Sequence, residues 1–204
     1  MLIKIYPENQ NPRLIDTITD CLKNGGVIIY PTDTVYAIGC DIHNHKALER
    51  LAQIKGIKPD KANFSLVCYD LSELSTYTRP IENEIFKLMK RLLPGPYTFI
   101  LNASNAVPKI FQSKKKTVGI RIPDNEIIRN IIKEFGGPVA STSIHDDDDV
   151  IEYTTDPELI YEKYQSLVDI VIDGGYGGNE ASTILDCTSG EIEVIREGKG
   201  SIDI

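Results

Sequence analysis

Residues 30–39 read Tyr-Pro-Thr-Asp-Thr-Val-Tyr-Ala-Ile-Gly and directly follow the apolar run at residues 27–29. The proline fixes its own φ and removes a backbone donor, so the chain must turn just as a buried strand ends. The turn places Thr32, Asp33 and Thr34 at the carboxyl end of that strand, where open α/β sheets form their ligand crevices. An ordinary strand-turn-strand, in which these side chains only satisfy turn amides, explains the same residues equally well.

The composition is that of a globular protein. With 204 residues, 41% hydrophobic and 25% charged, the chain can bury a large core, and we expect one domain spanning residues 1–204. No apolar run approaches the roughly 20 residues of a membrane span, and the N-terminus lacks a signal-peptide core. The four cysteines are scattered without C-x-x-C spacing. We therefore expect a cytoplasmic protein with reduced thiols and no contact with a membrane.

The net charge of −8 is unevenly distributed. Residues 46–133 carry a local balance of +8, whereas residues 134–204 carry −14. A basic middle segment is typical of a protein that binds anionic phosphates or carboxylates. The acidic last third argues against wrapping a long nucleic acid with the whole surface. Small anionic ligands fit this asymmetry better than a polynucleotide does.

Strand-like apolar runs alternate with helical patterns along the chain. Strands are expected at residues 2–6, 27–30, 64–68, 97–101, 117–122, 139–143, 168–172, 182–186 and 192–195, and helices at 13–23, 46–54, 82–93, 125–135 and 157–164. Several strands are joined too closely for helical crossovers, so part of the sheet must be antiparallel. This order predicts an α/β fold with a twisted mixed parallel/antiparallel sheet and flanking helices.

From about residue 15 to residue 198 the chain resembles the YrdC family, which comprises threonylcarbamoyl-AMP synthases and their YciO-like relatives. Residues 30–39 match its opening signature, Tyr/Phe-Pro-Thr-Asp/Glu-Thr-x-Tyr-x-x-Gly. The resemblance implies a concave, basic-lined cavity that joins L-threonine, bicarbonate and ATP into threonylcarbamoyl-AMP and pyrophosphate. That reaction is the first step toward N6-threonylcarbamoyladenosine in tRNA. Thr32 and Tyr36 would then contact the substrate, although core packing explains Tyr36 as readily.

Residues 55–66, Lys-Gly-Ile-Lys-Pro-Asp-Lys-Ala-Asn-Phe-Ser-Leu, place three lysines on a Gly/Pro-containing loop. Flexible ammonium groups beside a helix end suit phosphate binding, or they form a solvated basic loop. The resembling family has a Lys-x-Arg motif here. Lys55 matches its lysine, whereas Ile57, or Lys58 in a slightly longer loop, stands at the arginine; an ammonium cannot reproduce a guanidinium fork. This is the YciO-like pattern, and it implies Lys55 and Lys58 as catalytic groups and Lys61 as a phosphate ligand.

A charged residue interrupts the strand predicted at residues 117–122. Arg121 alternates with Ile120 and Ile122, and because an unpaired buried charge is costly, it points to solvent or lines a pocket. In the family, the arginine of the matching Val-x-Val-Arg-x-Pro motif holds the carboxylate of the amino-acid substrate. The resemblance implies that role for Arg121. The three lysines at 114–116 fit a solvated hairpin tip or an RNA site.

Residues 137–145, Gly-Pro-Val-Ala-Ser-Thr-Ser-Ile-His, place hydroxyls on one face of a strand that ends in a polar loop. Such serines often only satisfy local backbone. The family carries Pro-Ser-Ala-Asn here, with the serine and asparagine on the nucleotide. Ser143 matches the serine and His145 replaces the asparagine, so both are implied nucleotide ligands. Four aspartates follow at 146–149; they recruit Mg²⁺, repel a triphosphate, or are simply solvated.

The last third carries a glycine-rich segment at residues 173–178, Asp-Gly-Gly-Tyr-Gly-Gly, and a lone arginine near its end. Glycines permit close backbone approach and positive φ. The family has a Gly-Gly loop, a Ser-Thr-x-x-Asp strand and a closing Arg-x-Gly, and it directs the serine and the arginine toward the substrates. Ser182 and Arg196 match these positions. ATP, accompanied by Mg²⁺, is the implied co-substrate, and we expect no metal site in the protein itself, since His43 and His45 lack further ligands.

A second class of function uses the same basic cavity without catalysis. In this interpretation the chain is a non-catalytic or weakly active protein of the YciO type that recognises a nucleotide or RNA, including tRNA or double-stranded RNA. The missing arginine and asparagine equivalents favour it, whereas the retained Lys55, Arg121 and Arg196 favour the enzyme. The sequence specifies neither the acceptor acid nor the oligomeric state.

Overall fold

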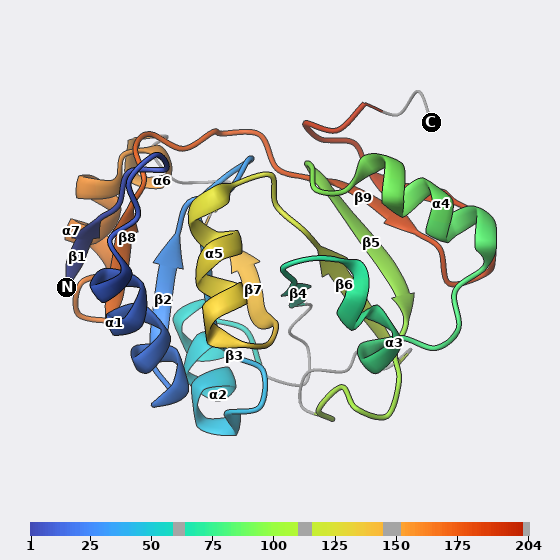
Figure 1. Ribbon diagram of the computed structural model, residues 1–204, viewed down its shortest axis with the longest axis horizontal. Helices are drawn as coiled ribbons and strands as arrows, with labels where there is room; N and C mark the ends of the chain where they lie inside the picture. The colour runs from blue at the N-terminus through green and yellow to red at the C-terminus, as the bar shows by residue number, and fades with distance from the viewer. Residues whose placement is uncertain (59–63, 110–115, 145–151, 202–204) are drawn as a thin grey trace.

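The computed structural model describes residues 1–58, 64–109, 116–144 and 152–201 (Figure 1). Its strands are β1 (Leu2–Lys4), β2 (Val27–Tyr30), β3 (Ala37–Asp41), β4 (Ser65–Val67), β5 (Tyr97–Asn102), β6 (Thr117–Arg121), β7 (Val139–Ser143), β8 (Ile170–Asp173), β9 (Thr183–Asp186) and β10 (Glu193–Arg196). Its helices are α1 (Pro12–Lys23), α2 (His45–Ile54), the 3₁₀ helix η2 (Leu71–Glu73), α3 (Leu74–Tyr77), α4 (Asn83–Leu92), α5 (Glu126–Phe135), α6 (Glu152–Thr155) and α7 (Pro157–Tyr164).

Within the described residues the strands form one ten-stranded sheet in the order β1-β8-β2-β3-β7-β4-β6-β5-β9-β10. The pairs β1–β8, β2–β8, β4–β6 and β5–β9 are parallel, and the remaining neighbours are antiparallel. The predicted mixed α/β sheet with flanking helices is therefore confirmed. Strands from the two ends of the sequence meet in this order, because β8 pairs with both β1 and β2.

The helices begin and end where local chemistry predicts. Asn11 caps α1 by accepting a hydrogen bond from the amide of Arg13. Asn44 caps α2 in the same way, as does Asn125 for α5. Helix α5 ends at Gly136, whose φ of 85° lies in the left-handed region that favours glycine.

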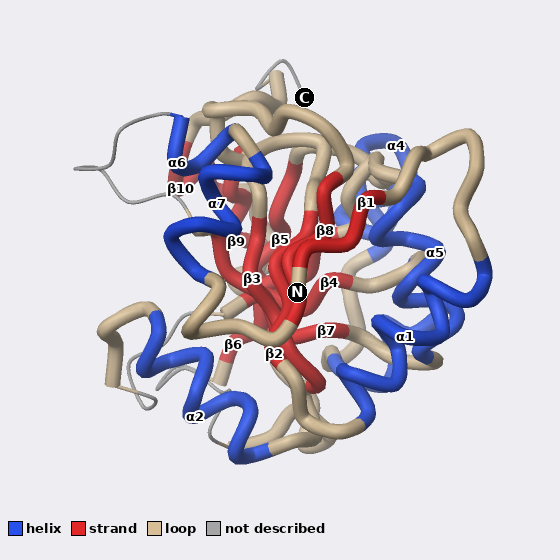
Figure 2. The backbone as a smooth tube through the Cα atoms, turned by 90° about the vertical axis from the view of Figure 1, so that its left-hand side faces the viewer, coloured by secondary structure: helices blue, strands red, loops and turns tan. Residues whose placement is uncertain are grey.

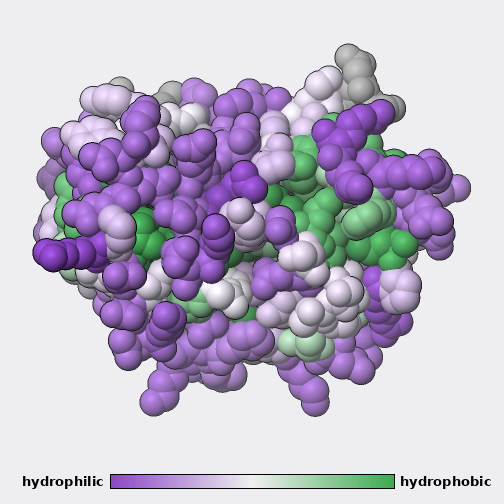
Figure 3. Space-filling view, in the orientation of Figure 1, coloured by the Kyte–Doolittle hydropathy of each residue, from purple (hydrophilic) through white to green (hydrophobic). Residues whose placement is uncertain are grey.

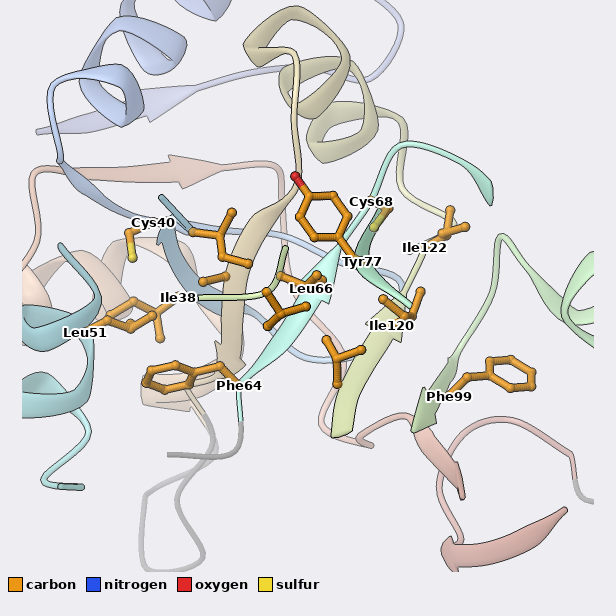
Figure 4. Close-up of a cluster of buried hydrophobic side chains, with 14 of the residues drawn as sticks. Ile38, Cys40, Leu51, Phe64, Leu66, Cys68, Tyr77, Phe99, Ile120 and Ile122 are labelled. Atoms are coloured by element: carbon orange, nitrogen blue, oxygen red, sulfur yellow. The ribbon is translucent and has the colours of Figure 1, made fainter. Parts of the chain in front are cut away.

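Helices cover both faces of the sheet, as Figure 2 shows. Alternation along β2 divides the core, since Ile28 and Tyr30 face α1 and α5 whereas Val27 and Ile29 face the other side. Helices α2 and α7 pack on that second side. Figure 4 shows part of this larger cluster, in which Leu51 of α2 meets side chains of β3 and β4.

The expected elements differ from the structure at their ends, in the shortest pieces and at the central strand β3, which was not among the expected strands. The first strand stops at Lys4, because residue 6 already belongs to a tight turn. The four-residue helices α3 and α6 are too short to display a helical period in sequence. None of the helices in the described part of the chain is long and apolar enough to cross a membrane. On the face seen in Figure 3 polar residues predominate, and apolar residues show toward α4 and β5.

Candidate functional site

A cavity of about 130 Å³ opens on the half of the sheet formed by β4, β6, β5 and β9. Val67 both lines it and belongs to the apolar cluster under α1 and α5, so the cavity adjoins that cluster on the same face of the sheet. The residues that line it are Val35, Ser65, Val67, Thr98, Arg121, Ser141, Thr142, Ser143, Ala181, Ser182, Ile184 and Arg196. These residues come from the turn after β2, from strands β4 to β7, and from the β9–β10 hairpin with the residues just before it.

Arg121, the last residue of β6, is fixed by the turn that follows β2. Its Nη2 donates hydrogen bonds to Thr32 Oγ1 at 3.1 Å, to Asp33 Oδ1 at 2.8 Å and to Thr34 Oγ1. The two threonine hydroxyls also contact each other, and Thr32 Oγ1 donates to the carbonyl of Val35 at 2.6 Å. The hydroxyls and carboxylate of the opening motif thus position one guanidinium.

The Arg121–Asp33 ion pair is nearly buried, with side-chain exposures of 10% and 9%. The hydrogen bonds from Arg121 to the turn after β2 all leave from Nη2, while its Nε and the Asp33 Oδ2 atom are buried without a hydrogen-bond partner. Polar atoms in this state are costly. Asp33 therefore balances the charge of Arg121 but does not bond all the nitrogens of its guanidinium. Arg121 still lines the cavity.

Arg196, the last residue of β10, stands on the neighbouring wall. Its Nη2 donates to the carbonyl oxygen of Ser182 at 2.8 Å, and its Nε donates to the same oxygen at 3.2 Å. The Ser182 hydroxyl in turn shares a 2.9 Å hydrogen bond with Thr98 Oγ1. This network joins the end of β10, the start of β9 and strand β5 around one side of the cavity.

The cavity carries a net positive charge, because Asp33 balances only one of its two arginines. Among the described residues, its lining includes Arg121 and Arg196 but no aspartate or glutamate. Partial burial and the like charge of Arg121 lower the pKa of the Arg196 guanidinium, although an arginine remains charged at neutral pH. Two cations that repel each other across hydroxyl-bearing walls form a site that an anion would stabilise.

The serines predicted at the end of β7 lie in this lining. Ser141 is buried and accepts a hydrogen bond from the Tyr30 hydroxyl, and Ser143 lies two residues further along the strand. Tyr36 lies outside the lining residues: its hydroxyl donates to the carbonyl of Gly175 at 2.7 Å and accepts from the amide of Gly174 at 3.2 Å. Tyr36 thus anchors the glycine-rich loop.

Two backbone segments connect the parts of the chain that form the walls. The amide of Gly178 donates to the carbonyl of Thr34 at 2.8 Å, and a Cβ on Gly178 would lie 2.4 Å from that oxygen. After β10 the chain returns to β9, where the amide of Lys199 donates to the carbonyl of Ala181 at 2.9 Å. The Lys199 ammonium donates to the carbonyl of Asp33. These contacts tie the β9 wall to the turn after β2.

The predicted lysines occupy a different place. Lys55 caps the C-terminus of α2, and Lys58 is exposed in the segment that follows; neither is among the lining residues. That segment leads toward Ser65, the first residue of β4, which does line the cavity. Lys61, His145 and the four aspartates at 146–149 lie outside the described residues. The described residues contain no cluster of His, Cys, Asp or Glu that could hold a metal ion.

A second cavity, of about 140 Å³, lies near the start of α4 and the turn after β9. Its charged lining residues, Arg79 and Glu82, have opposite signs, and none of the side chains predicted to bind substrate contributes to it. Of the predicted site residues, Arg121, Ser143, Ser182 and Arg196 line the first cavity.

Comparison with known proteins gives the family. Residues 20–198 match the Sua5/YciO/YrdC family model, whose description is telomere recombination. The chain belongs to the Sua5/YciO/YrdC family. It is 43% identical to Escherichia coli YciO over 200 residues, which are 97% of this chain and 95% of that protein. It is 29% identical to the threonylcarbamoyl-AMP synthase of Coxiella burnetii over 179 residues, or 87% of this chain and 95% of the synthase.

Solved structures of the Sua5/YciO/YrdC family agree with this assignment. The crystal structure of E. coli YciO superposes with a TM-score of 0.91 and 41% identity, covering 100% of this chain and 98% of YciO. Sua5 from P. abyssi, crystallised with L-threonine, superposes with a TM-score of 0.88 and 26% identity, covering 97% of this chain and 57% of Sua5. The predicted membership and the YciO-like character are confirmed.

Some lining residues were not predicted from sequence. Ser65 and Thr98 carry hydroxyls inside otherwise apolar strands. Their alternation with apolar neighbours was the sequence feature that could have indicated a polar face on these strands. Lys199 gave no signal, because an exposed lysine in an acidic tail has no recognisable pattern. Only the return of the chain across β9 reveals its contact with the turn after β2.

Proposed function

We propose that this protein is a threonylcarbamoyl-AMP synthase-like nucleotidyltransferase that acts on L-threonine, bicarbonate and ATP in a cytoplasmic step of tRNA modification. The observation that carries the proposal is the pairing of Arg121 with Arg196 in one cavity lined by hydroxyls and free of carboxylates among its described residues. The similarity of the chain to threonylcarbamoyl-AMP synthases and to a Sua5 crystallised with L-threonine supports the choice of substrates. The whole chain, residues 1–204, would act as one unit.

In the proposed reaction, the amine of threonine combines with bicarbonate to give a carbamate and water. A carbamate oxygen then attacks the α-phosphorus of ATP, a new P–O bond forms, and pyrophosphate leaves with the electron pair of the broken P–O bond. The demands on the protein are positioning and charge neutralisation rather than covalent chemistry. Two arginines on adjacent walls meet the second demand.

The roles follow from the contacts. Arg121, held by Thr32 and backed by Asp33, would bind the carboxylate of the amino acid through Nη1, because its hydrogen bonds to the turn leave from Nη2. Its charge would also act on the phosphates together with Arg196. Ser143, Ser182 and Arg196 would orient the phosphates and the carbamate. Lys55, Lys58 and Lys61, with His145, would bind the triphosphate, as the family resemblance implies. Mg²⁺ would arrive with ATP as part of the substrate.

Calorimetry with and without the co-substrates tests the proposal. We expect ATP to bind, its affinity to rise in the presence of L-threonine and bicarbonate, and pyrophosphate to be released when all three are present. If ATP binds but no pyrophosphate appears under any combination, the protein is a nucleotide-binding member of the YciO type. Absence of both binding and release contradicts the proposal.

Replacing Arg196 with glutamine should weaken ATP binding about 10-fold to 100-fold, because a charge-assisted contact with phosphate is lost. The melting temperature should shift by no more than about 2 °C, because Arg196 is exposed and its loss also removes repulsion with Arg121. R129Q is the matched control, since Arg129 lies on α5 and its Nε donates to the Tyr69 carbonyl, outside the cavity. Equal ATP affinities for R196Q and R129Q would exclude Arg196 from the site.

A further inference from the structure

The cavity is suited to charge but too small for a nucleotide. Its volume of about 130 Å³ falls below the roughly 300 Å³ at which pockets begin to enclose drug-sized ligands. None of its described lining residues is aromatic. Tyr30 and Tyr36, the two aromatic side chains of the opening motif, are fully buried, and their hydroxyls bind Ser141 and Gly175. A nucleotide whose phosphates meet the arginines must therefore place its base outside the cavity and stack it on another residue.

An exposed aromatic side chain lies on the β8–β9 connection, whose last residues, Ala181 and Ser182, line the cavity. Tyr176, in the connection from β8 to β9, is 83% exposed, which exceeds every other large hydrophobic residue among those described. In Figure 1 this connection crosses the upper edge of the molecule on its way to β9. It reaches the cavity at Ala181 and Ser182, a few residues after the tyrosine.

The loop that carries Tyr176 is held firmly on both sides of the ring. Before it, the amide of Gly175 donates to Asp173 Oδ1 at 2.9 Å and the Gly175 carbonyl accepts from Tyr36. After it, the amide of Gly177 donates to the carbonyl of Thr155 at 2.8 Å. The ring is therefore presented to solvent from a backbone that is hydrogen-bonded on both sides.

The same loop is joined to the arginine site. Gly178, two residues after Tyr176, donates to the carbonyl of Thr34, and the Thr34 hydroxyl accepts from Arg121. On the other side of the ring, Gly174 lies so close to Pro31 that a Cβ would approach its Cγ to 2.6 Å. The exposed ring and the Arg121 guanidinium are therefore carried by one hydrogen-bonded unit, the turn after β2 with the docked glycine loop.

We propose that Tyr176 is the stacking surface for the base of a nucleotide whose phosphates occupy the cavity between Arg121 and Arg196. The proposal rests on the nucleotide binding of the proposed function. It adds a residue that contacts the base, whereas the arginines contact the phosphates. Every base presents a flat π-face, so stacking alone accepts any nucleobase. A free mononucleotide and a base of an RNA strand share this chemistry, and we assign the ring to the mononucleotide, because the small cavity beside it fits phosphates.

The test compares ATP with inorganic tripolyphosphate, which carries the charge but no base. In calorimetry, Y176A should raise the Kd for ATP about 5-fold to 100-fold, the range found when an aromatic stacking residue is truncated, and leave the Kd for tripolyphosphate unchanged. Y176F should bind ATP as the parent protein does, because stacking needs the ring alone. Y6A is the matched control, since Tyr6 is also exposed, at 57%, but lies just after β1 at the far edge of the sheet.

A spectroscopic measurement checks the same contact independently of affinity. The chain contains no tryptophan, so Y176W introduces a single indole at the proposed stacking position. ATP should quench its fluorescence along the binding isotherm, and tripolyphosphate should leave it unchanged. Binding of ATP without quenching would overturn the proposal.

Three further outcomes also overturn it. Equal ATP affinities for Y176A and the parent protein would show that the ring makes no contact. Equal losses of ATP and tripolyphosphate affinity in Y176A would show that the residue only supports the loop. If Y176A weakens binding of a single-stranded oligoribonucleotide but not of ATP, the ring belongs to RNA. Failure of the proposed function differs from these outcomes, because the parent protein would then bind neither ATP nor tripolyphosphate. That result would exclude the base-stacking role as well.

Discussion

Replacing Arg121 with glutamine is expected to abolish detectable binding of ATP and of L-threonine, and to lower the free energy of unfolding by about 3–5 kcal/mol. Arg121 forms an ion pair with Asp33 at 2.8 Å, and both side chains are about nine-tenths buried. Glutamine would leave a buried carboxylate without its counter-charge. For a chain of this size the melting temperature should fall by roughly 6–20 °C, which differential scanning calorimetry will measure.

The double variant D33N/R121Q separates the two effects. It removes the unpaired carboxylate together with the guanidinium, so most of the lost stability should return while ligand binding stays absent. R129Q again serves as the control for loss of a positive charge elsewhere. Retention of threonine and ATP binding in D33N/R121Q would show that the cavity does not act through Arg121.

Replacing Gly178 with alanine is expected to weaken ATP binding at least tenfold and to destabilise the fold by about 1–3 kcal/mol. The added Cβ would lie 2.4 Å from the Thr34 carbonyl oxygen, a contact with backbone that can be relieved only by moving the loop or the turn after β2. Either movement disturbs the hydroxyl that binds Arg121. Calorimetric titration and thermal unfolding of G178A report the two effects.

The matched control is G137A. No heavy atom lies within 4 Å of a Cβ built on Gly137, and its φ is outside the left-handed region. Alanine there should leave ATP affinity unchanged and stability within about 0.5 kcal/mol, or slightly raised through the unfolded chain. If G178A behaves like G137A, the docking of the glycine loop has no part in shaping the site.

The sequence was informative wherever a local rule decides the outcome. The apolar period placed α1, α2 and α5 to within a residue or two, and alternation in β6 indicated that Arg121 leaves the apolar face. The family resemblance added Ser182 and Arg196, which the fold brings together although 14 residues separate them.

What the sequence did not reveal depends on contacts between distant segments. The hydroxyl of Tyr36 donates to a carbonyl in a loop 139 residues away. Its position inside the motif therefore could not show whether Tyr36 lines the cavity or anchors that loop. The sheet order that sets β4 between β7 and β6 is not encoded in any single strand. Tyr176 was visible in the glycine-rich segment, but only its exposure on a fixed loop distinguishes it from an ordinary turn residue.

The hydrogen bond from Lys199 to the carbonyl of Asp33 closes a contact between residues 166 positions apart. Because this contact and β9 complete the cavity, a partly opened molecule that has released either segment lacks a binding site. A bound anion therefore stabilises only the fully assembled sheet, by mass action. Amide hydrogen exchange in β2, β3 and β9 should accordingly slow together on saturation with ATP, as one cooperative unit rather than as three separate strands.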